Sequence, residues 1–545
     1  MRNLLILISC FLIPCITTAK DILIHPDASI IKENLYYFRD ADGELTRESI
    51  EPGDRLVLLG REDNSRNHLQ LEKVFGTAEK PITITNTPGT IVNINSDNTY
   101  GIFLNHCQHI RIDGGANHVS TSNPMHYGIQ IRIGKGGQSI KADNGSNFIS
   151  IKRVWIDVPL EVQNSSNSPA ILVKSNVQCF QGVERYSANT FIMQQVHISD
   201  NRISNAGSEA IYIGETGNGK NTNCTLKSIL TPIFNEKGKL IRIDSTATLQ
   251  SVDKILPHYL DDVVVSNNHI ENSGWDGIQL SWCHNFEVKN NRIEQYGVKE
   301  ENSHNYGIII GDGCSGNVQG NFIGKGSGNG INAKPSGNTH IFNNVIAQSG
   351  FLGAASPVYH AGINTYAENL SSSYIWGKNT EGEKVINLSH NLIYRPYGLG
   401  IRMNGKGPNN TTREENPHYR AVCIANVLVE SQNIGYDNPS SYNLQMAQVD
   451  EDTNVDYPAH ADTKSANHIS SSLDDVKLKN TSSSNIFEWD FRPIADSPLL
   501  DRAPSMVTNL EYRDYYDQLR QINAGGSQST GFQPDFGPAE RVFTP

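Results

Sequence analysis

A short phrase that recurs along the chain constrains the fold more than any other feature. In each copy, Asn is followed by one variable residue and then by an apolar residue. The copies are Asp200–Ile203, Asn267–Ile270, Asn290–Ile293, Gly320–Ile323, Asn343–Ile346 and His390–Ile393, with a fainter one at Ala425–Leu428. A second phrase follows most copies, in which a small residue precedes Ile, as in Gly277–Leu280 and Gly307–Ile310. A two-part unit that repeats in this way is the signature of a solenoid.

The residues around the repeat favour strands. Short β-branched runs such as Val263–Val265 lead into the Asn, and Asn, Gly and Ser fill the turns between them. The closest copies lie 23 residues apart, from Asn268 to Asn291 and from Asn321 to Asn344. That length accommodates three short strands and three turns per rung, so the chain is predicted to be an all-β parallel β-helix.

The recurring Asn residues are predicted to be structural. A buried turn leaves backbone groups that need partners, and a stacked amide column supplies both donors and acceptors. Asn also tolerates the left-handed conformation that such turns require. The predicted ladder comprises Asn201, Asn268, Asn291, Asn321, Asn344, Asn391 and Asn426.

The N-terminus has the features of a secretory signal. Arg2 gives the positive region, 4–16 the apolar core and Thr17–Ala19 the cleavage site. No later stretch is apolar and long enough for a transmembrane segment, so we expect a secreted or periplasmic monomer. The expected organisation is a signal peptide over 1–19, an N-terminal cap and first coil over 20–75, a β-helix over 76–485 with insertions at 214–262 and 366–384, and a closing segment over 486–545.

The formal net charge of −12 argues against nucleic acid as a partner. A local basic groove on an acidic body still permits an acidic polysaccharide. The mature chain has six Cys without zinc-like spacing, which argues against a thiolate metal site. Cys283 and Cys314 fall at nearly the same point of successive rungs, where they either bond or remain buried thiols.

The chain resembles the pectate-lyase-like superfamily of right-handed parallel β-helices. The resemblance rests on segments 52–59 and 76–84, which are similar to the opening coils of such proteins, and on Ser497–Asp501, which is similar to their closing segment. It implies the fold, an N-terminal cap and a secreted polysaccharide-lyase-like protein. The chain lacks that family's catalytic Lys and Arg motif blocks, so the resemblance does not carry over catalytic residues.

Alternation along the second phrase predicts a ligand-facing strip on one sheet. In Gly277–Leu280, Ile278 and Leu280 point inward, so Gln279 faces outward. Insertions flank the strand formed by the second phrase and could form the sides of a groove. His258 and His304, in these loops, would lie over the groove. A plain solvated sheet face is the alternative. The expected substrate-binding residues are Tyr212, Gln279, Trp282, Asn332, Asn364 and Asn404.

Two chemistries are compatible with this strip. In a lyase acting on an acidic polysaccharide by β-elimination, Lys334, Tyr366 or His360 is the candidate base. Arg402 and the amides would then stabilise the developing charge.

In a glycoside hydrolase, paired carboxylates would act instead. Glu209 and Asp276 occupy equivalent places in successive rungs, and Asp312 follows a nearby strand. The same oxygens suit Ca²⁺ as a cofactor, or they simply cap turns. A third alternative is a non-catalytic glycan-binding or surface-adhesion solenoid.

Overall fold

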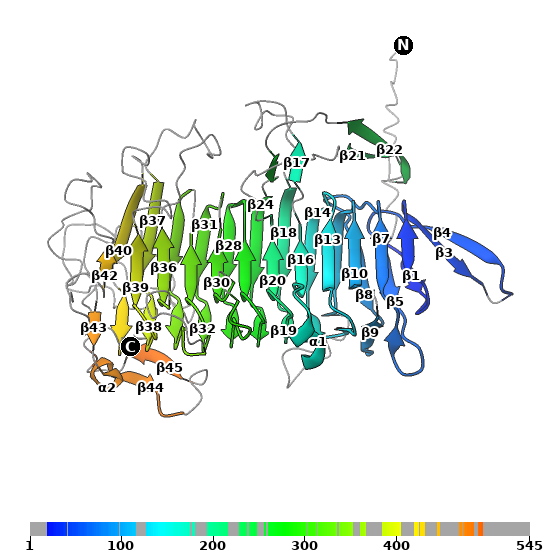
Figure 1. Ribbon diagram of the computed structural model, residues 1–545. Coiled ribbons are helices and arrows are strands. Elements are labelled where there is room, and N and C mark those ends of the chain that lie inside the picture. Colours follow the sequence, from blue (N-terminus) through cyan, green and yellow to red (C-terminus); the bar gives the residue numbers. More distant parts are fainter. Residues whose placement is uncertain are drawn as a thin grey trace, which may run out of the picture.

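A computed structural model gives the structure of the protein (Figure 1). It describes residues 19–40, 42–97, 99–115, 127–174, 177–179, 193–215, 228–236, 239–247, 255–257, 260–301, 304–311, 313–334, 337–352, 360–366, 384–404, 419–424, 426–430, 444–446, 468–470, 472–483, 489–493 and 497.

Three long sheets run along the molecule, and each turn of the chain contributes a strand to each of them (Figure 1). Sheet A contains β1 (Asp21–Ile24), β5 (Arg55–Leu58), β8 (Ile82–Asn86), β11 (Gln108–Asp113), β14 (Asn147–Lys152), β18 (Met193–Ser199), β24 (Leu260–Ser266), β28 (Phe286–Lys289), β31 (Gly316–Gln319), β34 (Thr339–Phe342), β37 (Lys384–Ser389) and β40 (Tyr419–Ile424), with β27 (Cys283–His284) beside β24.

Sheet B contains β4 (Leu45–Ser49), β3 (Leu35–Arg39), β2 (Ile30–Lys32), β7 (Leu69–Glu72), β10 (Tyr100–Asn105), β13 (Gln138–Asp143), β16 (Ile171–Val173), β20 (Ile211–Ile213), β26 (Ile278–Leu280), β30 (Ile308–Ile310), β33 (Ile331–Ala333), β36 (Ile363–Tyr366), β39 (Ile401–Asn404) and β42 (Leu444–Met446). Its first three strands pair antiparallel and form the hairpin at the N-terminal end.

Sheet C contains β6 (Ser65–Arg66), β9 (Val92–Ser96), β12 (Ile129–Ile133), β15 (Val154–Asp157), β19 (Arg202–Ser204), β25 (His269–Glu271), β29 (Arg292–Glu294), β32 (Phe322–Gly324), β35 (Val345–Ala347), β38 (Leu392–Tyr394), β41 (Val427–Val429) and β43 (His468–Ser470). Outside the three sheets lie the pairs β17 (Val177–Cys179) with β23 (Ile255–Pro257), β21 (Ser228–Phe234) with β22 (Leu240–Ala247), and β44 (Leu478–Asn480) with β45 (Asp490–Pro493), and the helices α1 (Leu160–Ser165) and α2 (Leu473–Val476). Neither described helix has the length and apolar character that crossing a bilayer requires.

The Asn ladder is confirmed, at the turn between sheets A and C. Asn291 Nδ2 donates to the carbonyl oxygen of Val265 at 2.8 Å and to Asn321 Oδ1 at 3.0 Å. Its own Oδ1 accepts from the backbone and side-chain nitrogens of Asn268 at 3.0 and 2.9 Å. The left-handed backbone, however, belongs to the residue before the ladder Asn wherever that residue is described, as at Asn290 with a φ of 55°. The ladder Asn is therefore selected for its amide and not for its backbone freedom.

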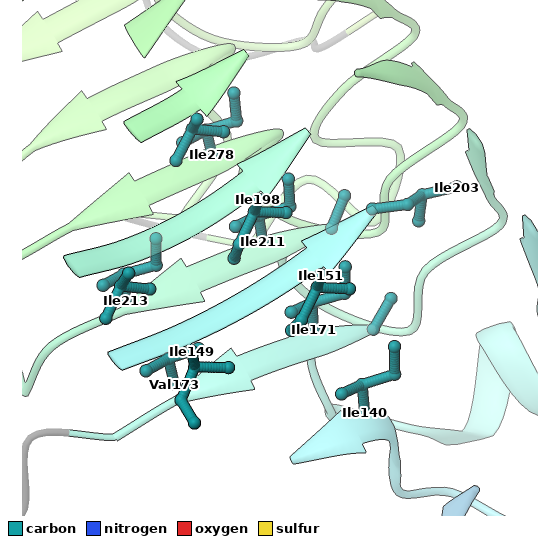
Figure 2. Close-up of a cluster of buried hydrophobic side chains, with 14 of the residues drawn as sticks. Ile140, Ile149, Ile151, Ile171, Val173, Ile198, Ile203, Ile211, Ile213 and Ile278 are labelled. Atoms are coloured by element: carbon teal, nitrogen blue, oxygen red, sulfur yellow. The ribbon is translucent and has the colours of Figure 1, made fainter. Parts of the chain in front are cut away.

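Columns of aliphatic side chains from the three sheets fill the interior (Figure 2). Ile151 and Ile198 of sheet A, Ile211 and Ile278 of sheet B and Ile203 of sheet C are all fully buried. Each buried Ile contributes roughly 1.5–3 kcal/mol relative to an exposed one, so the stacked rungs share one continuous core.

Cys283 and Cys314 lie in this interior as buried thiols that form no disulfide. The backbone nitrogen of Cys283 donates to Cys314 Sγ at 3.5 Å. The two residues therefore stack in successive rungs, which was one of the two predicted arrangements.

The small residue of the second phrase is required where rungs meet. A Cβ at Gly330 would lie 2.4 Å from Ile346 Cγ2 and 2.6 Å from the carbonyl oxygen of Gly362. At Gly400, the last glycine of the column, the nearest atom would be Leu428 Cδ2 at 3.1 Å. The glycines thus permit close approach of one rung to the next.

Gly330→Ala is expected to lower the free energy of unfolding by about 1–3 kcal/mol, the usual cost of overpacking. The change would be measured by urea denaturation followed by circular dichroism. Gly400→Ala is the matched control, because the flexible end of Leu428 can move away. Equal effects of the two substitutions would contradict the packing argument.

Candidate active site on the outer face of sheet B

The predicted outer column of sheet B is confirmed in its register. Tyr212 pairs with Gln279, Gln279 with Ile309, Ile309 with Asn332, and so on through Asn364 to Arg402. The central part of this outward column is covered and not open to solvent. Gln279 and Asn332 are each only 1% exposed, Tyr212 and Asn364 are each 8% exposed, and Arg402 is half-buried.

The buried amides of this column are not fully hydrogen-bonded. Asn332 Oδ1 accepts from Asn364 Nδ2 at 2.7 Å and from Asn329 Nδ2 at 3.3 Å. Within the described part of the chain, Gln279 Oε1, Asn332 Nδ2 and Asn364 Oδ1 have no hydrogen-bond partner. Unsatisfied buried polar groups are costly and uncommon, so the column differs in kind from the satisfied Asn ladder.

Two carboxylates lie at the turn that enters the same sheet. Glu209 and Asp276 each stand two residues before their strands, β20 and β26, and both are buried, at 3% and 0% exposure. Glu209 Oε2 accepts from Ser208 Oγ at 2.6 Å, and Asp276 Oδ1 accepts from the Tyr306 backbone nitrogen at 2.8 Å. Turn capping thus occupies one oxygen of Asp276, while no described group hydrogen-bonds to the other oxygen, Oδ2.

His304 faces both carboxylates from the loop before β30. Its Nδ1 lies 3.5 Å from Asp276 Oδ2 and 3.9 Å from Glu209 Oε1. The imidazole stacks on Trp275 with a centroid separation of 4.8 Å. One ligand atom of each of Glu209, Asp276 and His304 lies within 4.8 Å of the other two, and we call these three residues the acid–His cluster.

Burial dominates the electrostatics of the cluster. It raises the pKa of Glu209, and the charge of Asp276 raises it further. Burial also raises the pKa of Asp276, against the lowering effects of His304, the Tyr306 amide and the more distant Lys334 ammonium. The contact with Asp276 raises the pKa of His304. Two buried carboxylates and one imidazole therefore lack full compensation by positive charge.

Lys334 and Arg402 lie on the same face as the cluster. Lys334 follows β33 and is half-buried, and its charge reaches Asp276. Arg402 lies on β39, two strands beyond β33 in the sheet order, which places it roughly 10 Å further along the axis. Of the predicted cations, Lys334 is thus the one that the fold brings toward the carboxylates.

Other predicted residues are placed differently. His360 is 1% exposed in the turn before β36, and its ring contacts Tyr397 with centroids 5.8 Å apart. Trp282 is 5% exposed and packs over Gly313, where a Cβ would come within 2.5 Å of the indole. Both are packed side chains.

For Tyr366 and Asn404 the structure describes the backbone pairing of β36 with β39 only. Asp312 and His258 lie outside the described residues. The roles predicted for these four residues remain predictions.

One family model supports the fold. Residues 181–416 match the family model of the right-handed beta helix region. No curated protein is significantly similar to the chain. An alginate lyase from Paenibacillus sp. strain FPU-7 is 13% identical with a TM-score of 0.37, over 66% of this chain and 90% of that chain. The native GH136 lacto-N-biosidase from Eubacterium ramulus is 12% identical with a TM-score of 0.33, over 74% of this chain and 68% of that chain.

These two structures are of carbohydrate-active proteins, one a lyase and one a glycoside hydrolase, and likeness at this level does not bear on the reaction. The family model and the stacking of three parallel sheets agree with each other. The chain is a right-handed parallel β-helix protein.

Proposed function

We propose that the protein is a polysaccharide lyase that cleaves an acidic polysaccharide by β-elimination on the outer face of sheet B. One observation carries the proposal: Lys334 directly follows β33, whose Asn332 belongs to a column of buried amides with atoms that lack hydrogen-bond partners among the described residues. A cation, amides and carboxylates thus converge on one face. Export, predicted from residues 1–19, belongs to the same proposal because such polymers lie outside the cell.

The reaction requires a base and a stabiliser of negative charge. Lys334 acts as the base and takes the proton from the carbon next to the uronate carboxylate. A carbon–carbon double bond forms as the glycosidic carbon–oxygen bond breaks, and the departing oxygen receives a proton. Asn332 Nδ2, a donor without a hydrogen-bond partner among the described groups, would stabilise the charge that develops on the carboxylate. Arg402, roughly 10 Å further along the sheet, suits the carboxylate of a neighbouring sugar.

Incubation with alginate, polygalacturonate and chondroitin sulfate tests this proposal. We expect one of these polymers to yield products with the ultraviolet absorbance of an unsaturated uronate. New reducing ends without that absorbance would show hydrolysis instead. Binding with neither product would indicate the non-catalytic glycan-binding alternative.

A glycoside hydrolase is the second candidate, and the geometry of Glu209 and Asp276 favours it. One carboxylate oxygen of Glu209 lies no more than 4.8 Å from one of Asp276, which is compatible with the roughly 5–5.5 Å between the carboxyl groups of retaining enzymes. In that case one carboxyl group would protonate the leaving oxygen and the other would attack the sugar. Glu209→Gln would then abolish the release of reducing ends, whereas Lys334→Met would leave it largely intact.

A further inference from the structure

We propose that Glu209, Asp276 and His304 bind one divalent first-row transition-metal ion, of which Zn²⁺ is the best representative. The role of this ion rests on the proposed function, because it would receive the substrate carboxylate, but the site itself follows from the geometry of the acid–His cluster alone.

The ligand atoms are nearly in place for such an ion. Zinc binds imidazole nitrogen and carboxylate oxygen at about 2.0–2.2 Å, which puts neighbouring ligand atoms roughly 3–3.5 Å apart. His304 Nδ1 lies 3.5 Å from Asp276 Oδ2 and 3.9 Å from Glu209 Oε1. All three atoms lie within 4.8 Å of one another. Small side-chain rotations would therefore close the cluster around one ion.

The acid–His cluster contains a buried carboxylate oxygen that is available as a metal ligand. Asp276 is 0% exposed, and its Oδ2 has no hydrogen-bond partner among the described groups. The same holds for His304 Nδ1, which faces that oxygen. A metal ion between the two atoms would satisfy both and would offset the charge of two buried carboxylates.

A second His–Glu–Glu group on sheet C shows what a satisfied cluster looks like. His269 Nε2 lies 3.1 Å from Glu271 Oε1 and 3.3 Å from Glu294 Oε1. There, Arg202 and Arg292 pair with the two glutamates and supply positive charge. In the described structure the ion pairs of Glu209 and Asp276 are with His304 only. The two groups have similar ligands, and only the acid–His cluster lacks a guanidinium partner.

The ligand types select the class of metal. Ca²⁺ takes six to eight oxygen ligands, whereas one imidazole with two carboxylates suits Zn²⁺ and related ions. The His304 side chain is 34% exposed, although both carboxylates are buried. Three protein ligands with one side toward solvent are the arrangement of a metal that keeps a position open for another ligand. A uronate carboxylate is the ligand that the proposed function would place there.

The test uses the full-length mature protein without an affinity tag. After removal of metals with a chelator, calorimetric titration with ZnCl₂ is expected to show one site per chain. Asp276→Asn and His304→Ala are each expected to weaken Zn²⁺ binding by at least about 10–100-fold, a loss that even outer-shell changes around metals cause. Titration with CaCl₂ is expected to show much weaker binding at this site.

His269→Ala is the matched control, because it removes a His from the cluster that arginines already neutralise. It should leave Zn²⁺ binding unchanged, and circular dichroism should show that every variant is folded. Absence of a stoichiometric Zn²⁺ site, or equal binding by wild type and His304→Ala, would overturn the proposal. Zinc binding without polysaccharide cleavage would leave the metal site standing and remove the proposed function. Full cleavage by the metal-free protein would leave the proposed function standing and remove the role of the ion in binding the substrate carboxylate.

Discussion

Asn291→Ala is expected to lower the free energy of unfolding by about 3–5 kcal/mol. The substitution removes the donor to Val265 and Asn321 and the acceptor for Asn268, all of them buried. Each buried group that loses its partner costs about 1–3 kcal/mol. Because rungs of a solenoid stabilise mainly their neighbours, a break at this central position weakens the contacts on both of its sides. Urea denaturation followed by circular dichroism would measure the change.

Asn317→Ala provides the matched control for the ladder. Asn317 lies on β31 of sheet A, is partly exposed and has no place in the amide column. Its substitution is expected to change the unfolding free energy by no more than about 0.5 kcal/mol, as is usual for surface positions. A similar loss in both variants would mean that the column does not hold the turns together.

The repeat made most of the fold predictable. Since identical positions of successive rungs stack in a parallel β-helix, aligning the Asn phrases also aligned Gln279 with Tyr212 and Asn332 with Asn364, and the strand pairing has this register. Left-handed backbone at the turns was expected as well, but it falls one residue before the ladder Asn. In a repeat the period fixes which residues stack, whereas the local dihedral angles depend on hydrogen bonding within the turn.

The candidate site was predictable only in part. Glu209 and Asp276 were recognised as equivalent positions because both precede a strand of the repeat by two residues. The approach of His304 depends on the loop before β30, and the backbone bond from Tyr306 to Asp276 depends on the next rung. The sequence did not predict the burial of Gln279 and Asn332. Alternation along a strand shows which side chains point to the outer face of the sheet, but not whether other segments cover that face. The loops determine both the position of His304 and the covering of the outer column, and the loop sequences do not follow the repeat.

Lys334→Met is expected to reduce the rate of β-elimination by about 10²–10⁴-fold, the usual contribution of a positioned general base. Methionine keeps the apolar length of the side chain but cannot accept a proton. Lys334→Arg separates two roles for this residue, since a guanidinium retains the positive charge and stays protonated in proteins. If Lys334 is the base, both variants are inactive. If it only balances the charge of the buried carboxylates, Lys334→Arg keeps most of the activity.

The control for these variants is Lys289→Met, which removes an ion-paired lysine from β28 of sheet A. It should leave the rate of unsaturated-product formation unchanged. Zn²⁺ binding, measured on the same proteins, should persist in all three variants, because Lys334 is not among the atoms of the acid–His cluster. Full activity of Lys334→Met would move the base elsewhere, and the next candidate would be Tyr366, at the end of the adjacent strand β36. Loss of activity in both Lys334→Met and Lys334→Arg, with metal binding intact, would instead assign the proton transfer to Lys334 and leave the cluster to hold the substrate carboxylate.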